Sequence, residues 1–248
     1  MLILLPPSES KRPPRRGKSL DLSTLSHPEL TPLREQVLSA LEVLCRDTPA
    51  DAIEALDLGP TQFDLVAQNA GLSGAATAPA SSIYTGVLYA ALDFASLRGL
   101  ELRRANRRIG IVSALFGLLS PPDRICAYRL SGAARLPGIG PLPGFWRSAV
   151  SATVARHPGL VVDMLSSPYS SMVGLPPDSV TVKVWQDGPS GQRTAVSHFN
   201  KATKGEVARV WATMPTNPGK PDDLVDVLRE VGWRAELAGA RLDVWRRD

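Results

Sequence analysis

Hydrophobic residues along the chain fall into short continuous runs and longer stretches with helical spacing. The continuous runs cover residues 2–5, 109–115 and 159–165, and polar, glycine or proline residues follow each of them. Runs of this length are typical of buried parallel strands. Residues 180–185 instead alternate between apolar and polar, which predicts a half-exposed strand, and residues 194–199 are expected to pair with it across the DGPSG turn.

Helical spacing occupies most of the remaining chain. It is clearest over residues 31–44, and it recurs over 50–58, 62–70 and 204–214. Residues 83–97 are largely apolar and are expected to be helical after Gly86. The tail from Arg234 to Arg246 predicts a hairpin that turns near Gly239. Because strands and helices interleave, the pattern favours an α/β or mixed α+β fold, and with no repeat or linker the whole of 1–248 is expected to form a single unit.

Composition narrows the class of protein. The chain has 248 residues and is 44% hydrophobic, without an apolar stretch of the roughly 20 residues that a membrane helix requires. The apolar start has no basic residue ahead of it, unlike a signal peptide, so we expect a cytoplasmic protein. Trp146 lies in the Gly/Pro-rich stretch GIGPLPGFW and is expected to tether a surface loop.

Cysteine and histidine are too scattered to suggest a disulfide framework or a metal site. Cys45 and Cys126 lie far apart and belong to no CxxC pair, and the three histidines are equally dispersed. We therefore expect no metal and no cofactor, and iron is an improbable direct ligand because no set of two histidines and a carboxylate is evident.

Positive charge is gathered into three blocks, although the net charge is only +4. The blocks are Lys11, Arg12, Arg15, Arg16 and Lys18; Arg98, Arg103, Arg104, Arg107 and Arg108; and Lys201, Lys204 and Arg209. They form one basic face if they converge in space, and otherwise they are separate solvated patches.

Polar side chains follow the ends of the predicted strands. These residues, with those of the segment SHFNKATKG and of AYRLSG, are Ser8, Glu9, Lys11, Ser113, Arg129, Asp163, Ser166, Asn200, Lys201 and Lys204. Because open α/β sheets place ligand sites at the carboxyl edge, we expect these groups to bind an anion such as phosphate or carboxylate. The alternative is that Asp163, Arg129 and the lysines form buried ion pairs with one another.

The residue types at these positions neither establish nor exclude catalysis. Ser8 or Ser166 with His198 and Asp163 would supply the residue types of a nucleophile triad, but no GxSxG motif is present. A desolvated Lys11 or Lys201 could act as a base or form a Schiff base. The chain has no GxxxxGK[ST], which disfavours a Walker nucleotide site.

Several stretches occur in the order seen in one protein family. They are LLPPSESK, YTGVLYAAL, VSALFGLLSPPDRICAYRL, RLPGIGPLPGFW, VVDMLSSPYSS and SHFNKATKG. With them the chain resembles, over nearly its whole length, the YaaA family of peroxide stress resistance proteins. The resemblance implies a single mixed α/β unit with a mixed sheet, surrounding helices, a helix-hairpin-helix element and a positively charged cleft. It also implies a cytoplasmic bacterial protein that limits iron-dependent damage during peroxide stress and binds DNA.

By position, the helix-hairpin-helix element implied by the resemblance corresponds to residues 51–72, with Gly59 at the turn. Such elements hold phosphates through backbone amides at the turn, yet this segment contains no lysine or arginine. Affinity for duplex DNA would then come from the basic blocks and would be sequence-independent and salt-sensitive. The expected DNA contacts are Gly59, Thr61, Arg103, Arg104, Arg107 and Arg108 of a monomer.

Departures from the family pattern keep a second hypothesis open. Ser10 replaces the usual glycine of PPSEGK, Ala127 replaces a proline, and Leu165 stands in the run where an arginine is usual. A specialised paralogue would use the cleft to bind or convert a small phosphorylated or carboxylated molecule. Its ligand would then lie among the polar strand-end residues, together with Tyr84.

Overall fold

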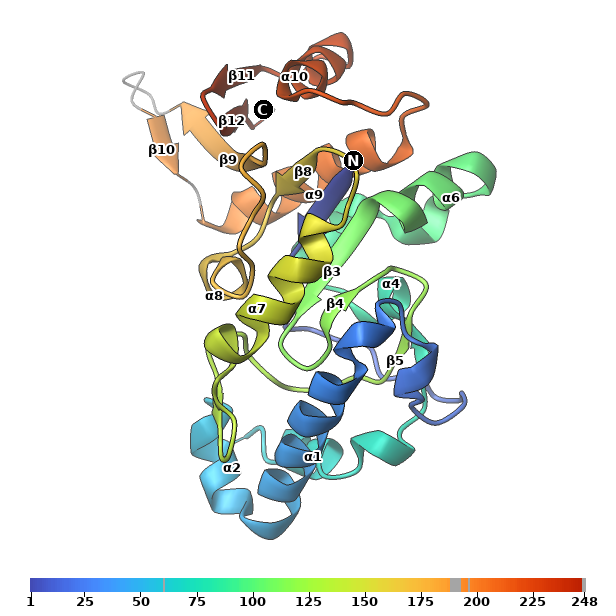
Figure 1. Ribbon diagram of the computed structural model, residues 1–248, viewed down its shortest axis with the longest axis vertical. Helices are drawn as coiled ribbons and strands as arrows, with labels where there is room; N and C mark the ends of the chain where they lie inside the picture. The colour runs from blue at the N-terminus through green and yellow to red at the C-terminus, as the bar shows by residue number, and fades with distance from the viewer. Residues whose placement is uncertain (60, 188–192, 196, 247–248) are drawn as a thin grey trace.

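The computed structural model describes residues 1–59, 61–187, 193–195 and 197–246, except for the side chains of 193–195 and 197–199. These residues form a mixed α/β fold built around an eight-stranded sheet (Figure 1). The strand order is β11-β12-β9-β8-β1-β3-β4, and β10 lies beside β9. None of the described helices is long and apolar enough to cross a membrane.

The strands follow the apolar runs of the sequence. The main sheet consists of β1 (Leu2–Leu5), β3 (Ile109–Ser113), β4 (Gly117–Leu119), β8 (Val161–Asp163), β9 (Val180–Asp187), β10 (Arg193–Ala195), β11 (Ala235–Ala238) and β12 (Arg241–Trp245). Two small ribbons pair β2 (Ala78–Pro79) with β5 (Arg124–Ile125) and β6 (Arg135–Leu136) with β7 (Gly140–Pro141). As predicted, the tail forms a hairpin, and its turn contains Gly239 with a positive φ of 62°.

Strand β1 lies between two parallel partners. Leu5 is opposite Ile111 of β3, and Leu4 is opposite Asp163 of β8. Every residue of β3 and β8 is buried, which explains why these runs are continuously apolar rather than alternating. The carboxyl ends of the three strands therefore meet at one edge of the sheet.

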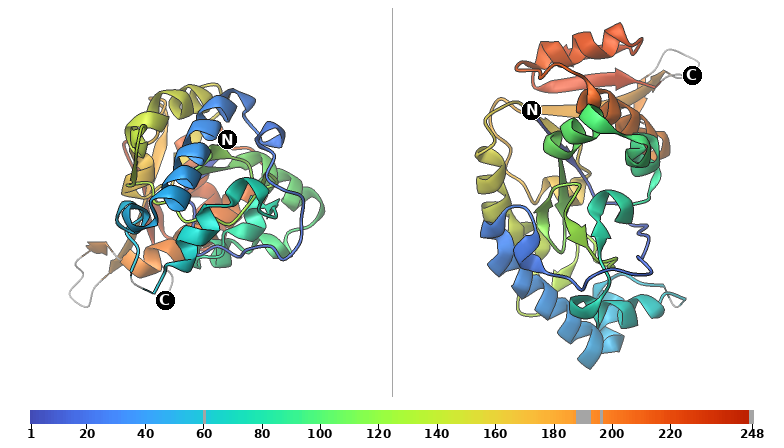
Figure 2. Two further views of the ribbon diagram at one scale, coloured as in Figure 1. Left: turned by 90° about the horizontal axis from the view of Figure 1, so that it is seen from below. Right: turned by 90° about the vertical axis from the view of Figure 1, so that its right-hand side faces the viewer.

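Helices cover both faces of the strands. They are α1 (Thr31–Asp47), α2 (Pro49–Ala55), α3 (Asp64–Asn69), α4 (Ala80–Ile83), α5 (Val87–Leu92), α6 (Gly99–Arg108), α7 (Leu142–Ala155), α8 (Ser167–Ser170), α9 (Ser197–Thr213) and α10 (Pro221–Glu230), with short turns η1 (Leu22–Thr24), η2 (Pro28–Leu30), η3 (Leu72–Gly74) and η4 (Phe94–Ser96). Helix α7 lies on one side of the central strands, and α5, α6 and α9 lie on the other (Figure 2). Helices α1 to α3 extend the molecule beyond the carboxyl edge (Figure 1).

Three local expectations were wrong in part or in full. The helix expected after Gly86 does begin at Val87, but it ends at Leu92, because Asp93 adopts a left-handed conformation (φ 48°). Residues 197–199 belong to helix α9, so the predicted second strand is limited to β10, and the DGPSG turn falls largely on residues outside the described ranges. Trp146 is not at the surface: it is fully buried in α7, and its Nε1 donates to the Ala114 carbonyl at 2.8 Å.

Gly205 allows α9 to approach α5 closely. A Cβ at this position would lie 2.2 Å from the Leu88 carbonyl oxygen and 2.8 Å from the Ala91 Cβ. Both atoms are fixed parts of α5, and neither is the end of a flexible side chain. A methyl group at Gly205 could therefore be accommodated only by moving α9 away from α5. This contact accounts for the glycine that ends SHFNKATKG.

We expect Gly205→Ala to lower the free energy of unfolding by about 1–3 kcal/mol, the usual range for overpacking a core. Urea denaturation measures the difference. Gly144→Ala is the matched control, since Gly144 is also helical and no atom lies within 4 Å of its Cβ position. That variant should be unchanged or more stable by up to about 1 kcal/mol. Equal losses in the two variants would contradict the close-approach explanation.

Candidate functional site

Lys11 stands at the carboxyl edge of the sheet, in the loop that follows β1. Its Nζ donates to the Ser8 carbonyl at 2.8 Å and to the Glu9 carbonyl at 3.4 Å. The same nitrogen lies 4.3 Å from the centre of the Tyr128 ring and 5.7 Å from that of Tyr84. A backbone bridge between Lys11 and Tyr84 fixes the loop against α4 and α5.

The amine of Lys11 is easily deprotonated. Burial is the main cause that lowers its pKa to about 7; the positive charge of Arg129 acts in the same direction, and Glu9 opposes it. An exposed lysine has a pKa of about 10.4. In a large fraction of molecules, Lys11 is therefore a neutral amine near pH 7. A lysine that acts as a base or nucleophile must be in this form.

A chain of buried hydroxyl groups lies beneath this amine. The Ser113 and Tyr128 hydroxyls are 2.8 Å apart, and the Tyr128 and Tyr84 hydroxyls are 3.0 Å apart. Ser113 Oγ also accepts the Phe116 N–H at 3.2 Å. Burial raises the pKa of Tyr84 and of Tyr128, so both phenols are protonated and can donate hydrogen bonds.

Arg129 is positioned by helix α3. The Asn69 side chain at the end of α3 donates to the Arg129 carbonyl at 2.7 Å and accepts the Arg129 N–H at 2.9 Å. Gln68 donates to the neighbouring Ala127 carbonyl at 2.9 Å. These bonds fix the loop that carries Arg129 near Lys11. They come from residues 51–72, the segment that the family resemblance assigns to DNA binding.

The Arg129 guanidinium has unused hydrogen-bonding capacity. Its Nε is buried and has no partner among the described residues, while Nη1 lies 3.7 Å from a Glu9 carboxylate oxygen. Arg129 is 19% exposed and Glu9 is 83% exposed, so this ion pair is loose and open to solvent. A ligand carboxylate or phosphate could replace Glu9 on the guanidinium.

Asp163 and Lys204 form the second part of the carboxyl edge. Asp163 accepts the Leu165 N–H at 2.8 Å, and burial raises the pKa of this carboxyl group. Lys204 donates to the Met164 carbonyl at 3.0 Å, and its pKa is lowered by burial in spite of Asp163. The two groups are electrostatically coupled, as the ion-pair alternative supposed, but each also binds the backbone.

The remaining predicted site residues differ in accessibility. Ser8 is buried, with its hydroxyl bonded to the Ser10 carbonyl and accepting the Thr85 N–H at 3.1 Å. Ser166 and Lys201 are exposed, and Asn200 has a buried Oδ1 without a partner in the described part of the chain. The His198 side chain lies outside the described residues, so the triad hypothesis is untested.

The sequence reasoning missed two residues that shape the site. Tyr128 carries the ring over which Lys11 lies, and Asn69 fixes the backbone of Arg129. Tyr128 precedes Arg129 in AYRLSG, so its type and place could have marked it. For Asn69, a lone amide within a helical pattern, the sequence carried no signal.

The predicted DNA contacts do not form one surface. Gly59 and Thr61 are exposed at the α2–α3 turn, but this segment carries Asp51, Glu54, Asp57 and Asp64 without any compensating cation. Helix α6 and the α2–α3 pair lie toward opposite ends of the long axis of the molecule (Figure 1). The two groups of residues are thus too widely separated to form a single compact patch.

Two arginines of α6 are engaged inside the protein. Arg108 is buried and donates to the carbonyls of Trp211, Met214 and Thr216 at 3.0, 2.7 and 2.6 Å. Arg104 donates to the Thr213 carbonyl at 3.0 Å. These bonds satisfy backbone carbonyls at the end of α9, a structural role that the sequence did not indicate. Arg103 and Arg107 remain exposed.

Members of the three basic blocks do meet elsewhere. Arg12 and Arg98 line one hollow of about 430 Å³, together with Asp93. Arg209 donates to the Asp93 carbonyl at 2.8 Å and thus lies at the same turn. The structure therefore brings one arginine from each block to the segment around Asp93.

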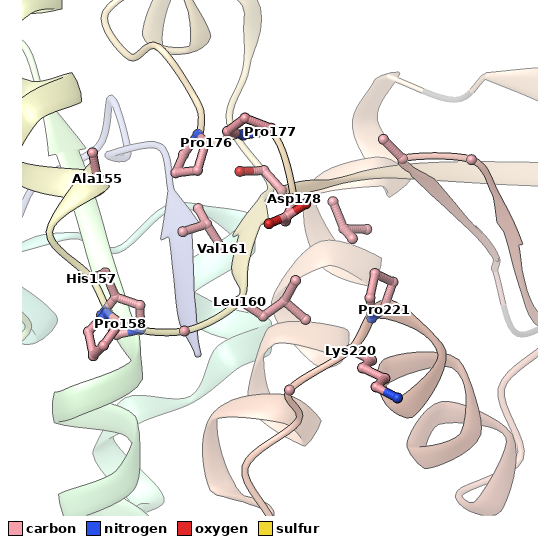
Figure 3. A pocket seen from close by; sticks show the side chains of 16 residues that line it. Ala155, His157, Pro158, Leu160, Val161, Pro176, Pro177, Asp178, Lys220 and Pro221 are labelled. Atoms are coloured by element: carbon pink, nitrogen blue, oxygen red, sulfur yellow. The ribbon is translucent and has the colours of Figure 1, made fainter.

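A larger hollow, of about 670 Å³, lies at the amino edge of the sheet, opposite the carboxyl edge that carries Lys11 (Figure 3). It is formed before the starts of β8, β9 and β12, and its walls include Pro158, Pro176, Pro177 and Pro221. Its charged side chains are Asp178 and Lys220, which are of opposite sign. This balance does not match the cationic site predicted from the sequence.

The cysteines are poorly placed for reaction with peroxide. Cys45 and Cys126 are both buried, and burial raises the pKa of each thiol, that of Cys126 to about 12. Peroxide reacts with the thiolate, which both environments disfavour.

We expect Asn69→Ala to lower the free energy of unfolding by about 1–3 kcal/mol, because the Arg129 N–H and C=O, both partly buried, lose their partner. Gln68→Ala removes one bond from a more exposed residue and should cost less. Thermal and urea unfolding of the two variants measure this difference. A smaller loss for Asn69→Ala than for Gln68→Ala would argue against Asn69 as the anchor.

Comparison with known proteins agrees with the order of motifs in the sequence. The family model described as "Peroxide stress protein YaaA" matches residues 1–236. A UPF0246 protein of Streptomyces coelicolor is 42% identical over 243 residues, covering 95% of this chain and 92% of the relative. A UPF0246 protein of Corynebacterium efficiens is 40% identical over 245 residues and covers 97% of both chains. The chain therefore belongs to the YaaA (UPF0246) family of peroxide stress proteins.

Proposed function

We propose that the protein serves the peroxide stress response by binding a small phosphorylated or carboxylated molecule at the Lys11 site. This site is defined here as Ser8, Lys11, Tyr84, Tyr128 and Arg129. The observation that supports the proposal is the placement of an amine and a guanidinium beside each other over buried hydroxyl groups. Two cations that share a partly buried region repel each other, and an anion between them would relieve that repulsion.

The two cations would have different roles in binding. The planar guanidinium of Arg129 suits two oxygen atoms of a carboxylate or phosphate, and its Nε is without a partner among the described residues. Lys11 would add positive charge in its ammonium form, which burial and Arg129 keep in equilibrium with the neutral amine near pH 7. Glu9, exposed and only loosely paired with Arg129, would compete with the ligand until displaced.

A thermal-shift titration with inorganic phosphate and with citrate tests this binding. We expect Tm to begin to rise near the Kd and then to increase with the logarithm of the anion concentration, because a ligand that binds the folded state stabilises it in proportion to ln(1 + [L]/Kd). The rise should be lost in Arg129→Gln and Lys11→Met, and it should begin at lower concentration in Glu9→Gln. Arg103→Gln/Arg107→Gln should keep it. A rise that is equal in all variants, or no rise with either anion, would reject the site.

DNA binding is the second candidate function, and the meeting of Arg12 with Arg98 favours it. The exposed cations on these blocks, including Arg103 and Arg107, could follow a phosphate backbone without reading sequence. If the protein binds DNA in this way, the acidic α2–α3 pair contributes little to the attraction of phosphate groups. Protection from iron-dependent damage would be indirect, since the described residues contain no group of three or more His, Cys, Asp or Glu that could hold a metal ion. A cytoplasmic location fits both candidates.

Gel-shift assays over a series of salt concentrations test the DNA reading. Arg12→Glu/Arg98→Glu should weaken binding to any duplex and flatten its salt dependence, because fewer counterions are released. Arg46→Glu/Arg135→Glu changes the net charge equally at exposed positions outside the three blocks and is the control. If both double variants weaken binding alike, the attraction reflects net charge and the localised interface is rejected.

A further inference from the structure

We propose that Lys11 is a nucleophile that forms an imine with an aldehyde or ketone bearing a carboxylate or phosphate. This inference rests on the anion-binding function proposed above and adds a covalent step to it. Its basis is the geometry of the amine, which is held at a defined point of the Lys11 site next to a cation that can orient the ligand.

The hydrogen bonds of Nζ are compatible with a neutral amine, and the face of the Tyr128 ring, whose centre is 4.3 Å from Nζ, suits the ammonium form. A neutral lysine has two N–H donors and one lone pair, whereas the ammonium form has three donors and no lone pair. The carbonyls of Ser8 and Glu9 supply two acceptors, at 2.8 and 3.4 Å. These acceptors can take up both N–H groups and leave the lone pair for attack on a carbonyl carbon. The pKa of about 7, set by burial and by Arg129, makes this form accessible near neutral pH.

Arg129 and Tyr128 supply the other requirements of the reaction. The guanidinium would hold the carboxylate or phosphate of the substrate, which places the carbonyl carbon near Nζ. Tyr128 lies directly under the amine and carries a protonated hydroxyl linked to Ser113 and Tyr84. Such a hydroxyl group can donate a hydrogen bond to the oxygen that develops negative charge during attack.

The covalent step balances without an additional reagent. The Nζ lone pair forms a bond to the carbonyl carbon, and the oxygen gains a proton to give a carbinolamine. That oxygen then leaves as water, and both amine protons are transferred in the process, so that amine and carbonyl become imine and water. Neither oxidant nor reductant is consumed.

Lys204 is the other buried lysine of the carboxyl edge and is a poorer candidate. It donates to the Met164 carbonyl at 3.0 Å. Burial lowers its pKa too, but the negative charge of Asp163 opposes this shift, whereas the positive charge of Arg129 adds to the shift at Lys11. Lys201 lies exposed on α9. The structure thus separates one oriented amine from two lysines that do not share its surroundings.

Reductive trapping tests the proposal. The full chain is incubated with glyoxylate and cyanoborohydride at pH 7, and the modified lysines are located by peptide mass spectrometry. Hydride reduction of the imine would leave a carboxymethyl group on Lys11. Since the neutral fraction at pH 7 is on the order of a thousandfold larger for a pKa of about 7 than for an exposed lysine, Lys11 should be labelled at least about tenfold faster than surface lysines. This preference should shrink as pH rises towards 10, where surface amines also lose their protons.

Variants separate an oriented reaction from simple reactivity. Arg129→Gln should slow labelling by glyoxylate more than labelling by formaldehyde. Loss of the Arg129 charge raises the pKa of Lys11 and slows both reactions, but only glyoxylate has an anionic group for the guanidinium to hold. Lys183→Arg, at an exposed position on β9, should leave the labelling of Lys11 unchanged. Lys11→Arg should remove the fast phase; where that variant folds poorly, the modified position mapped in the unaltered protein gives the answer.

The outcomes also distinguish the two levels of the proposal. Labelling that is no faster at Lys11 than at surface lysines would overturn the imine, whereas a thermal shift with phosphate or citrate that depends on Arg129 would leave anion binding intact. Absence of both would remove both. Fast labelling of Lys11 that is unaffected by Arg129→Gln would also overturn the proposal, because the anion-bearing substrate would then lack its holder.

Discussion

The parallel pairing of β1 with both β3 and β8 is the constraint on which the site depends. It sets Leu5 opposite Ile111 and Leu4 opposite Asp163, so the segments that follow these strands emerge side by side. Lys11, Ser113 and Asp163 are far apart in sequence, and this register alone brings their strands to a common edge. A sheet edge of this kind is the usual ligand position in α/β proteins, because the loops there converge while the strands beneath them stay rigid.

Desolvation gives the residues at that edge their chemical character. Burial lowers the pKa of Lys11 and of Lys204 and raises that of Asp163, so three ionisable groups are held away from their usual charge preference. Shifted pKa values of this kind are common at functional sites, where the reaction or the ligand requires them. The α2–α3 pair contributes to this arrangement through Asn69, which anchors Arg129, and it lacks the cations that contact with a phosphate backbone requires.

The sequence predicted the elements better than it predicted the roles of individual side chains. The apolar runs gave the correct strands because burial on both faces leaves an unbroken hydrophobic signal, as in β3. The prediction of surface exposure was wrong for Trp146 and Arg108. A tryptophan in a Gly/Pro-rich stretch and an arginine in a basic block are both expected at the surface. Both instead donate to distant backbone carbonyls, of Ala114 and of Trp211. Such partners are 32 and 103 residues away, beyond the reach of any local pattern.

By itself, the sequence determined the mixed α/β class, the strand-end position of Ser8 and Lys11, and membership of the family, because these depend on local periodicity and on the order of motifs. Only the tertiary structure decided that Lys11 lies over Tyr128 beside Arg129, that Arg108 is internal, and that Gly205 is a contact between α9 and α5. The reason is physical: hydrogen bonds, desolvation and close packing depend on distances between residues, and the fold sets those distances while sequence separation does not.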